Sequence, residues 1–164
     1  MSTLLGRPYG WGNMYFYNDC SAEILNFYTP FGIWLPRHSS EQAKIGKLVD
    51  KSAEDVVGRI KYLIENGKKF TTIVYIGGHV MLYIGNYPNK NSDLHEQMAM
   101  TYQNIWGLKP ADGSYRSIIG MSVLLPILAF YSEDLDISSL ASRKLFQIIY
   151  LDGDKDAEKS KEDL

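Results

Sequence analysis

The sequence predicts an α+β domain in which N-terminal helices pack on a central antiparallel β-sheet. Helical periodicity with capping residues fills residues 20–64, and short β-branched and aromatic runs follow from residue 70 to residue 151. Helices first and strands afterwards, without alternation, is the element order of α+β domains. A length of 164 residues favours one domain. We expect it to span residues 1–151, with residues 152–164 as a charged tail that lacks apolar periodicity.

Three helices are predicted in the first half of the chain. Residues 20–28 place apolar side chains on one side, and Asp19 is the expected N-cap. Residues 39–49 open with an S-x-x-Q capping box that begins at Ser39. A longer helix opens with S-x-x-D at Ser52, has apolar positions at helical spacing, and stops at Asn66-Gly67.

The apolar period then changes to that of strands. Residues 70–76 and 79–84 are predicted to be antiparallel strands joined by a tight turn at Gly77-Gly78. Residues 86–95 are expected to form a polar loop, and residues 98–106 and 117–125 two further strands. Residues 140–151 are predicted to form a helical turn followed by a last strand.

Composition and charge exclude several classes of function. The net charge is only -2, which gives no electrostatic basis for binding nucleic acid or an anionic membrane. The longest apolar run, residues 121–131, is too short to span a bilayer. The spacing of one Cys and three His matches no zinc site, and no phosphate-binding or dinucleotide motif is present, so neither a metal nor a cofactor is expected. The N-terminus has no signal pattern, so a signal for export would have to lie outside these residues.

One cysteine and one histidine are candidates for nucleophilic catalysis. Cys20 lies at a predicted helix start, where free N–H groups and the helix dipole favour a thiolate; the alternative is a small buried apolar residue. His38 and His95 fall in polar loops and are expected at the surface. His79 opens a strand directly after two glycines, of which Gly78 would let substrate or backbone approach closely. Its alternative role is that of a satisfied histidine at a strand end.

A third group should orient the imidazole of His79. Gln103 and Asn104 lie on the next predicted strand, and alternation allows only one of them to share a face with His79. The sequence does not choose between the two.

Four motifs in chain order resemble one family. They are P-Y-G-W-G from residue 8, D-C-S from residue 19, L-P-R-x-S-x-x-Q from residue 35 and G-H-x-M-L-Y-I-G from residue 78. The sequence, over about residues 6–151, is similar to the papain-like catalytic domain of NlpC/P60 cell-wall cysteine peptidases. The branch it resembles most usually carries bacterial Src-homology-like domains ahead of the catalytic domain, and such domains are expected to lie outside these residues.

The resemblance implies a role for each matching residue. Cys20 would be the nucleophile and His79 the general base and then the general acid. Gln103 stands where this branch commonly has a third catalytic histidine. Tyr9 would position or polarise the scissile carbonyl, and the backbone N–H of Cys20 would serve the oxyanion.

Further residues are implied to line the substrate groove. Asp19 and Ser21 match its substrate side, and the Asp can meet a free amine of the stem peptide in this branch. Arg37 and Ser39 match a loop beside the site, with a loop brace and a helix cap as their alternative roles.

The implied activity is hydrolysis of peptidoglycan stem peptides, usually between gamma-D-glutamate and the diamino acid, by a protein exported to the periplasm or cell envelope. Because Gln103 cannot carry charge, an inactive homologue that only binds wall peptides is one alternative. An amidase, toxin or transpeptidase of the same fold is another, and a purely structural interaction module is a third.

Overall fold

The computed structural model describes residues 4–89, 97–110, 112–131 and 134–152. Its α-helices are α1 (Cys20–Tyr28), α2 (Ser39–Gln42) and α3 (Val56–Asn66). The 3-10 helices are η1 (Trp11–Phe16), η2 (Thr29–Phe31) and η3 (Leu140–Ser142). The strands are β1 (Lys47–Asp50), β2 (Thr72–Tyr75), β3 (Val80–Pro88), β4 (Gln97–Leu108), β5 (Ser117–Ile127) and β6 (Gln147–Tyr150).

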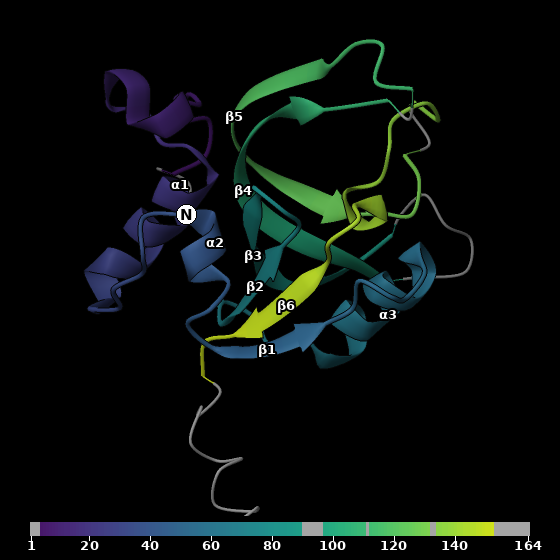
Figure 1. Cartoon of the computed structure of the whole chain (residues 1–164), viewed down its shortest axis with the longest axis horizontal. Helices are drawn as coiled ribbons and strands as arrows, with labels where there is room; N and C mark the ends of the chain where they lie inside the picture. The colour runs from purple at the N-terminus through teal and green to yellow at the C-terminus, as the bar shows by residue number, and fades with distance from the viewer. Residues whose placement is uncertain (1–3, 90–96, 111, 132–133, 153–164) are drawn as a thin grey trace, which may run out of the picture.

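The strands form one antiparallel sheet, which confirms the predicted α+β class. The strand order is β1-β6-β2-β3-β4-β5, so β6, the last strand along the chain, lies between β1 and β2. β4 and β5 are the longest strands and curl away from the rest of the sheet (Figure 1). Helices α1 and α2 lie together on one side, whereas α3 lies beside the far end of the sheet (Figure 1).

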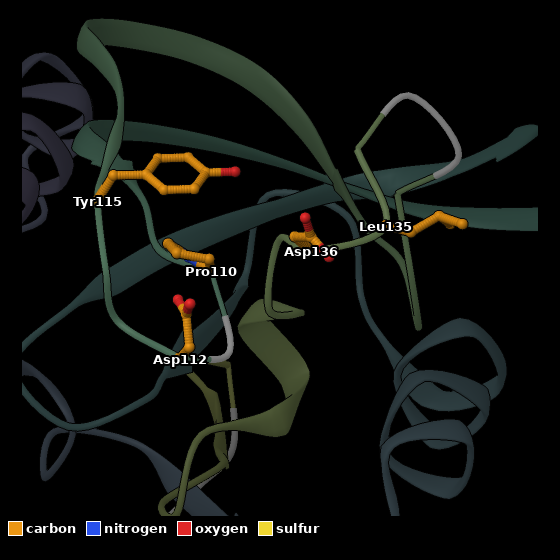
Figure 2. A pocket seen from close by; sticks show the side chains of 5 residues that line it. All are labelled: Pro110, Asp112, Tyr115, Leu135 and Asp136. Carbon is orange, nitrogen blue, oxygen red and sulfur yellow. The ribbon is translucent and has the colours of Figure 1, made fainter.

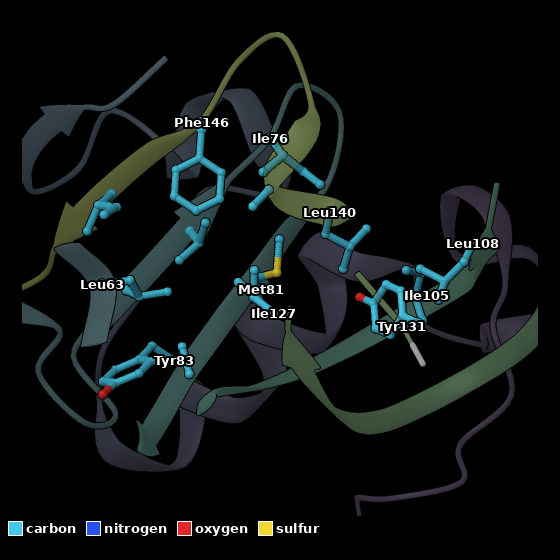
Figure 3. Close-up of a cluster of buried hydrophobic side chains, with 14 of the residues drawn as sticks. Leu63, Ile76, Met81, Tyr83, Ile105, Leu108, Ile127, Tyr131, Leu140 and Phe146 are labelled. Carbon is cyan, nitrogen blue, oxygen red and sulfur yellow. The ribbon is translucent and has the colours of Figure 1, made fainter. Parts of the chain in front are cut away.

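Alternation of side chains along the strands gives the sheet two apolar faces. On β3, Val80 and Leu82 face α1, where they pack with Ile24 and Tyr102. Met81, the next residue along, belongs to the opposite cluster, which includes side chains from α3, η3 and the curled strands (Figure 3). Helix α1 therefore rests on one face of β3, which His79 directly precedes, and of β4, which carries Gln103.

The prediction of a helix over residues 39–49 is wrong. Only the single turn of α2 is helical, and residues 47–50 form β1, in which Leu48 pairs with Ile149. A Cβ at Gly46 would lie 2.2 Å from the Tyr150 carbonyl oxygen, so glycine allows the close approach of β1 to β6. The capping box also fails, because the N-cap of α2 is His38 and no side chain caps it.

Helix α3 stops as predicted but starts later. Its N-cap is Asp55, whose carboxylate accepts the N–H of Gly58 at 2.6 Å. Ser52 instead accepts the N–H of Phe146 at 3.0 Å, so it joins the turn before α3 to the start of β6. Asn66 is the last helical residue, as predicted.

The glycine pair forms the predicted tight turn between β2 and β3. Gly77 and Gly78 have φ of 74° and 81°, a conformation that side chains disfavour, and Ile76 N–H donates to His79 C=O at 3.0 Å. Strand β3 runs on to Pro88, so the expected polar loop over residues 86–95 begins too early.

The remaining sequence predictions concern the chain ends and loops. The helical turn and last strand expected over residues 140–151 are present as η3 and β6. Asp152, at the start of the predicted tail, forms an ion pair with Lys68 at 2.9 Å, and the rest of that tail lies outside the described residues, as does His95. No helix in the described ranges is long and apolar enough to cross a membrane.

Candidate active site

The start of α1 meets the start of β3. Asp19 caps the helix by accepting the N–H of Ala22 at 2.9 Å, and Cys20 is the first helical residue. The Sγ atom of Cys20 lies 3.9 Å from the carbonyl oxygen of Gly78, immediately before His79 in the chain. The helix therefore holds the sulfur against the glycine turn, and the Cys20 residue is only 5% exposed.

The imidazole of His79 is held from β4. Its Nε2 lies 2.7 Å from Oε1 of Gln103, which is fully buried. Asn104 points to the other side of β4, where its amide donates to the carbonyl of Asn18 at 3.0 Å. Of the two residues that the sequence left open, the structure places Gln103 beside His79.

Cys20 and His79 are neighbours through the glycine turn rather than through a direct bond. Within the described part of the chain, the hydrogen bonds of Cys20 and His79 do not join their side chains to each other. Catalytic hydrogen bonds are often long before substrate binds. The contact of Cys20 Sγ with the carbonyl of Gly78 therefore serves as the evidence that the sulfur lies close to His79.

Burial sets the charge state of both groups. Burial raises the pKa of the Cys20 thiol above its ordinary 9.0, and the carboxylate of Asp19 adds to the rise. The backbone N–H of Val80 on β3 and those of Ser21 and Cys20 at the helix start lower that pKa, but burial outweighs them. Burial lowers the pKa of His79 below 6.5, against the hydrogen bond to Gln103. Both shifts favour the uncharged forms of the pair, thiol and neutral imidazole, at neutral pH.

This charge state predicts the pH dependence of alkylation. Because the thiolate is the reactive form and the pKa is raised, we expect iodoacetamide to label Cys20 slowly at pH 7 and faster as the pH rises beyond 9.0. Cys20 is the single cysteine, so mass spectrometry of the intact protein reports its rate directly. The His79→Gln variant should give the same profile. A rate already at its plateau by pH 7 would show a thiolate–imidazolium pair and contradict the expectation.

Tyr9 lies within an aromatic cluster, close enough to Cys20 for a charge on the sulfur to raise its pKa. Its ring packs against Trp11 at 6.1 Å and Trp106 at 6.0 Å between centroids. Burial, then the charges of Cys20 and Asp19, raises the pKa of Tyr9 to about 12. Its hydroxyl therefore keeps its proton and is a donor near Cys20. Trp11 and Trp106 are 73% and 41% exposed, so they offer apolar walls to a ligand.

Arg37 binds the capping residue of α1. Its guanidinium donates to both carboxylate oxygens of Asp19, at 3.0 and 2.7 Å, to Ser21 Oγ at 2.9 Å and to Asn13 Oδ1 at 3.0 Å. Burial raises the pKa of Asp19, but hydrogen bonds from Arg37 and from the N–H of Ala22 lower it overall. These contacts are those of a loop brace. Ser39, the other residue of that motif, makes no cap bond at the start of α2.

A buried carboxylate on the inner face of α1, that of Glu23, was not predicted from the sequence. Glu23 is 1% exposed and accepts from Asn18 Nδ2 at 2.7 Å and from the hydroxyl of Tyr102. Burial raises the pKa of Tyr102, and the hydrogen bond to Glu23 adds to the rise. The signal was an acidic residue between Ala22 and Ile24, both on the buried side of the helix. This network anchors α1 to β4.

A shallow pocket lies away from these residues. It is lined by Pro110, Asp112, Tyr115, Leu135 and Asp136, between the β4–β5 connection and the segment before η3 (Figure 2). Its lining contains no cysteine or histidine, so it offers no nucleophile or base of the kind found at the start of α1.

A helix opened by cysteine, packed on an antiparallel sheet that carries histidine, defines the papain-like class of fold. Residues 6–107 match the sequence profile of the NlpC/P60 family, and the chain belongs to that family.

Solved structures of two relatives resemble the fold. A novel NlpC/P60 endopeptidase from Photobacterium damselae subsp. piscicida is 27% identical, with a TM-score of 0.79 over 92% of this chain and 37% of that chain. The peptidoglycan hydrolase RipB from Mycobacterium tuberculosis is 16% identical, with a TM-score of 0.50 over 92% of this chain and 60% of its own. This chain thus spans less than two thirds of either protein. No curated protein matches the sequence.

Proposed function

We propose that this domain is a cysteine peptidase that hydrolyses peptidoglycan stem peptides. The observation that carries the proposal is the meeting of the Cys20 helix start with the Gly78–His79 turn, in a chain of the NlpC/P60 family. The two structural relatives, an endopeptidase and a peptidoglycan hydrolase, support a peptidase that acts on the cell wall. A wall substrate in turn favours a place in the periplasm or cell envelope.

In the proposed mechanism, His79 takes the proton of the Cys20 thiol through Nδ1, because Nε2 is engaged with Gln103. The sulfur attacks the scissile carbonyl, and the N–H of Cys20 and the hydroxyl of Tyr9 stabilise the oxyanion. His79 then gives its proton to the leaving amine, and water activated by the same imidazole releases the acyl group. Gln103 holds the ring during both halves of the reaction.

The proposed bond is the one between gamma-D-glutamate and the diamino acid. The rings of Trp11 and Trp106 pack against the ring of Tyr9 and would form the aromatic wall along which a stem peptide reaches the sulfur. Asp19 and Ser21, both bound to Arg37, would face the peptide on its amino side. Gly78, exposed at the turn, would let the peptide backbone approach His79.

Digestion of defined muropeptides tests the proposal. We expect mass spectrometry of the products to show a sugar-linked dipeptide ending in D-glutamate and a released peptide with a new amine on the diamino acid, whichever of lysine or diaminopimelate is present. Release of intact stem peptide from the sugar would identify an amidase, and cross-linked products a transpeptidase. Binding of muropeptides without any cleavage would favour a catalytically silent homologue and would contradict the proposal.

A further inference from the structure

A chain of three side-chain hydrogen bonds runs behind His79. The hydroxyl of Thr101 lies 2.7 Å from the carbonyl oxygen of Leu125, and Gln103 Nε2 lies 2.9 Å from Thr101 Oγ1. Gln103 Oε1 lies 2.7 Å from Nε2 of His79. Thr101 and Gln103 are both 0% exposed, so water does not compete for these bonds.

The donors and acceptors in this chain leave one consistent arrangement of protons. A carbonyl oxygen only accepts, so Thr101 must give its single hydroxyl proton to Leu125. Toward Gln103 the hydroxyl oxygen therefore acts as the acceptor, and the amide turns its NH₂ group to Thr101. The amide oxygen then faces His79, and since it only accepts, the proton of the neutral imidazole must be on Nε2. Nδ1 is left with a free lone pair.

An amide beside a catalytic histidine needs a neighbour that fixes its orientation, whereas a carboxylate does not. Either oxygen of a carboxylate accepts from imidazole, but the two ends of an amide have opposite roles and nearly the same shape. If Gln103 turned its NH₂ group to His79, the ring would carry its proton on Nδ1. That nitrogen then could not accept the proton of a thiol, so the wrong tautomer is an inactive one.

We propose that Thr101 is a positioning residue that fixes the Gln103 amide and thereby sets the tautomer of His79. The inference rests on the proposed role of His79 as the base of a cysteine peptidase. The side-chain hydrogen bonds of Thr101 reach Leu125 and Gln103, so it would act on His79 through Gln103. Its backbone partner, Leu125, lies opposite Thr101 in the β4–β5 register, so the sheet itself supplies the fixed end of the chain.

Nitrogen-15 NMR of the histidine rings tests this inference without substrate. Spectra recorded above pH 7, where His79 is neutral, are expected to show its proton on Nε2 in the wild-type protein. Thr101→Val removes the hydroxyl at constant shape and should populate the Nδ1–H form, whereas Thr101→Ser should keep the wild-type pattern. Loss of the signals in His79→Gln assigns them. An unchanged tautomer in a folded Thr101→Val protein, or an Nδ1–H ring in the wild type, would overturn the inference.

Two further variants keep the test decisive. Thr72→Val is the matched control, because Thr72 is equally buried on β2 but its hydroxyl accepts from Lys68 N–H, whereas that of Thr101 accepts from Gln103. It should leave the tautomer unchanged. Thr101→Ala serves as the second removal variant if valine does not fold.

The activity measurement separates this inference from the proposed function. On muropeptides, Thr101→Val should lower kcat by about tenfold to about hundredfold with little change in KM, and Thr101→Ser should restore most of the rate. An inactive wild type with an Nε2–H ring would remove the peptidase proposal but leave the tautomer assignment standing. An active wild type whose rate does not change in Thr101→Val would remove the tautomer proposal alone.

Discussion

Replacement of Cys20 by serine is expected to lower the rate of muropeptide cleavage by at least about a thousandfold. An alcohol is far less acidic and less nucleophilic than a thiol, and its oxygen is smaller than sulfur in a site whose geometry is set for sulfur. The initial rate of product release, followed by liquid chromatography and mass spectrometry, measures the loss. Since Cys20 is the single cysteine, no other thiol can replace it.

The partner of the nucleophile provides the matched comparison. His79→Gln should reduce the rate to a similar extent, because it removes the base that the proposed mechanism uses for both proton transfers. His38→Gln changes an exposed histidine at the start of α2 and should keep the rate within about twofold. Circular dichroism and thermal melting establish that each variant is folded. More than a tenth of the wild-type rate in folded Cys20→Ser protein would mean that the nucleophile has been misassigned.

Local signals in the sequence predict the parts of the fold that local contacts determine. Asp19 caps α1, and Asn66 ends α3, because caps depend on residues within one turn. The pair Gly77-Gly78 specifies its hairpin since both positions need positive φ. Strand β1 was missed because its partner, β6, lies about one hundred residues further along the chain, and the short run K-L-V-D has no period that distinguishes it from a helix.

In the candidate site, too, local sequence predicts some features and distant contacts determine others. Alternation shows that only one of Gln103 and Asn104 can face His79, but the choice depends on the register of β3 against β4, which contains a bulge between Tyr83 and Gly85. The contact of Arg37 with Asp19 and the burial of Glu23 arise from elements that meet only in the folded chain. Residue types therefore predict the chemistry, whereas the partners of each residue follow from topology.

Replacement of Arg59 by methionine is expected to lower the free energy of unfolding by about 3 kcal/mol. The guanidinium of Arg59 is buried in α3 and donates to four backbone carbonyls: those of Lys51 at 3.0 Å, Ala141 and Arg143 at 2.7 Å each, and Ser52. Methionine keeps most of the apolar packing but leaves these acceptors without their donors. In a domain of this size, the loss corresponds to a fall in Tm of roughly 6–12 °C.

Lys61 on the same helix gives a control for loss of positive charge. Its side chain is 72% exposed and lies 3.9 Å from Glu65, so Lys61→Met should change stability by no more than about 0.5 kcal/mol. Urea unfolding followed by circular dichroism measures both variants. Because Arg59 joins the turn before α3 to η3, its loss should act through backbone acceptors that only the folded chain brings together. Equal stability of Arg59→Met and Lys61→Met would show that water or local rearrangement satisfies those carbonyls without the guanidinium.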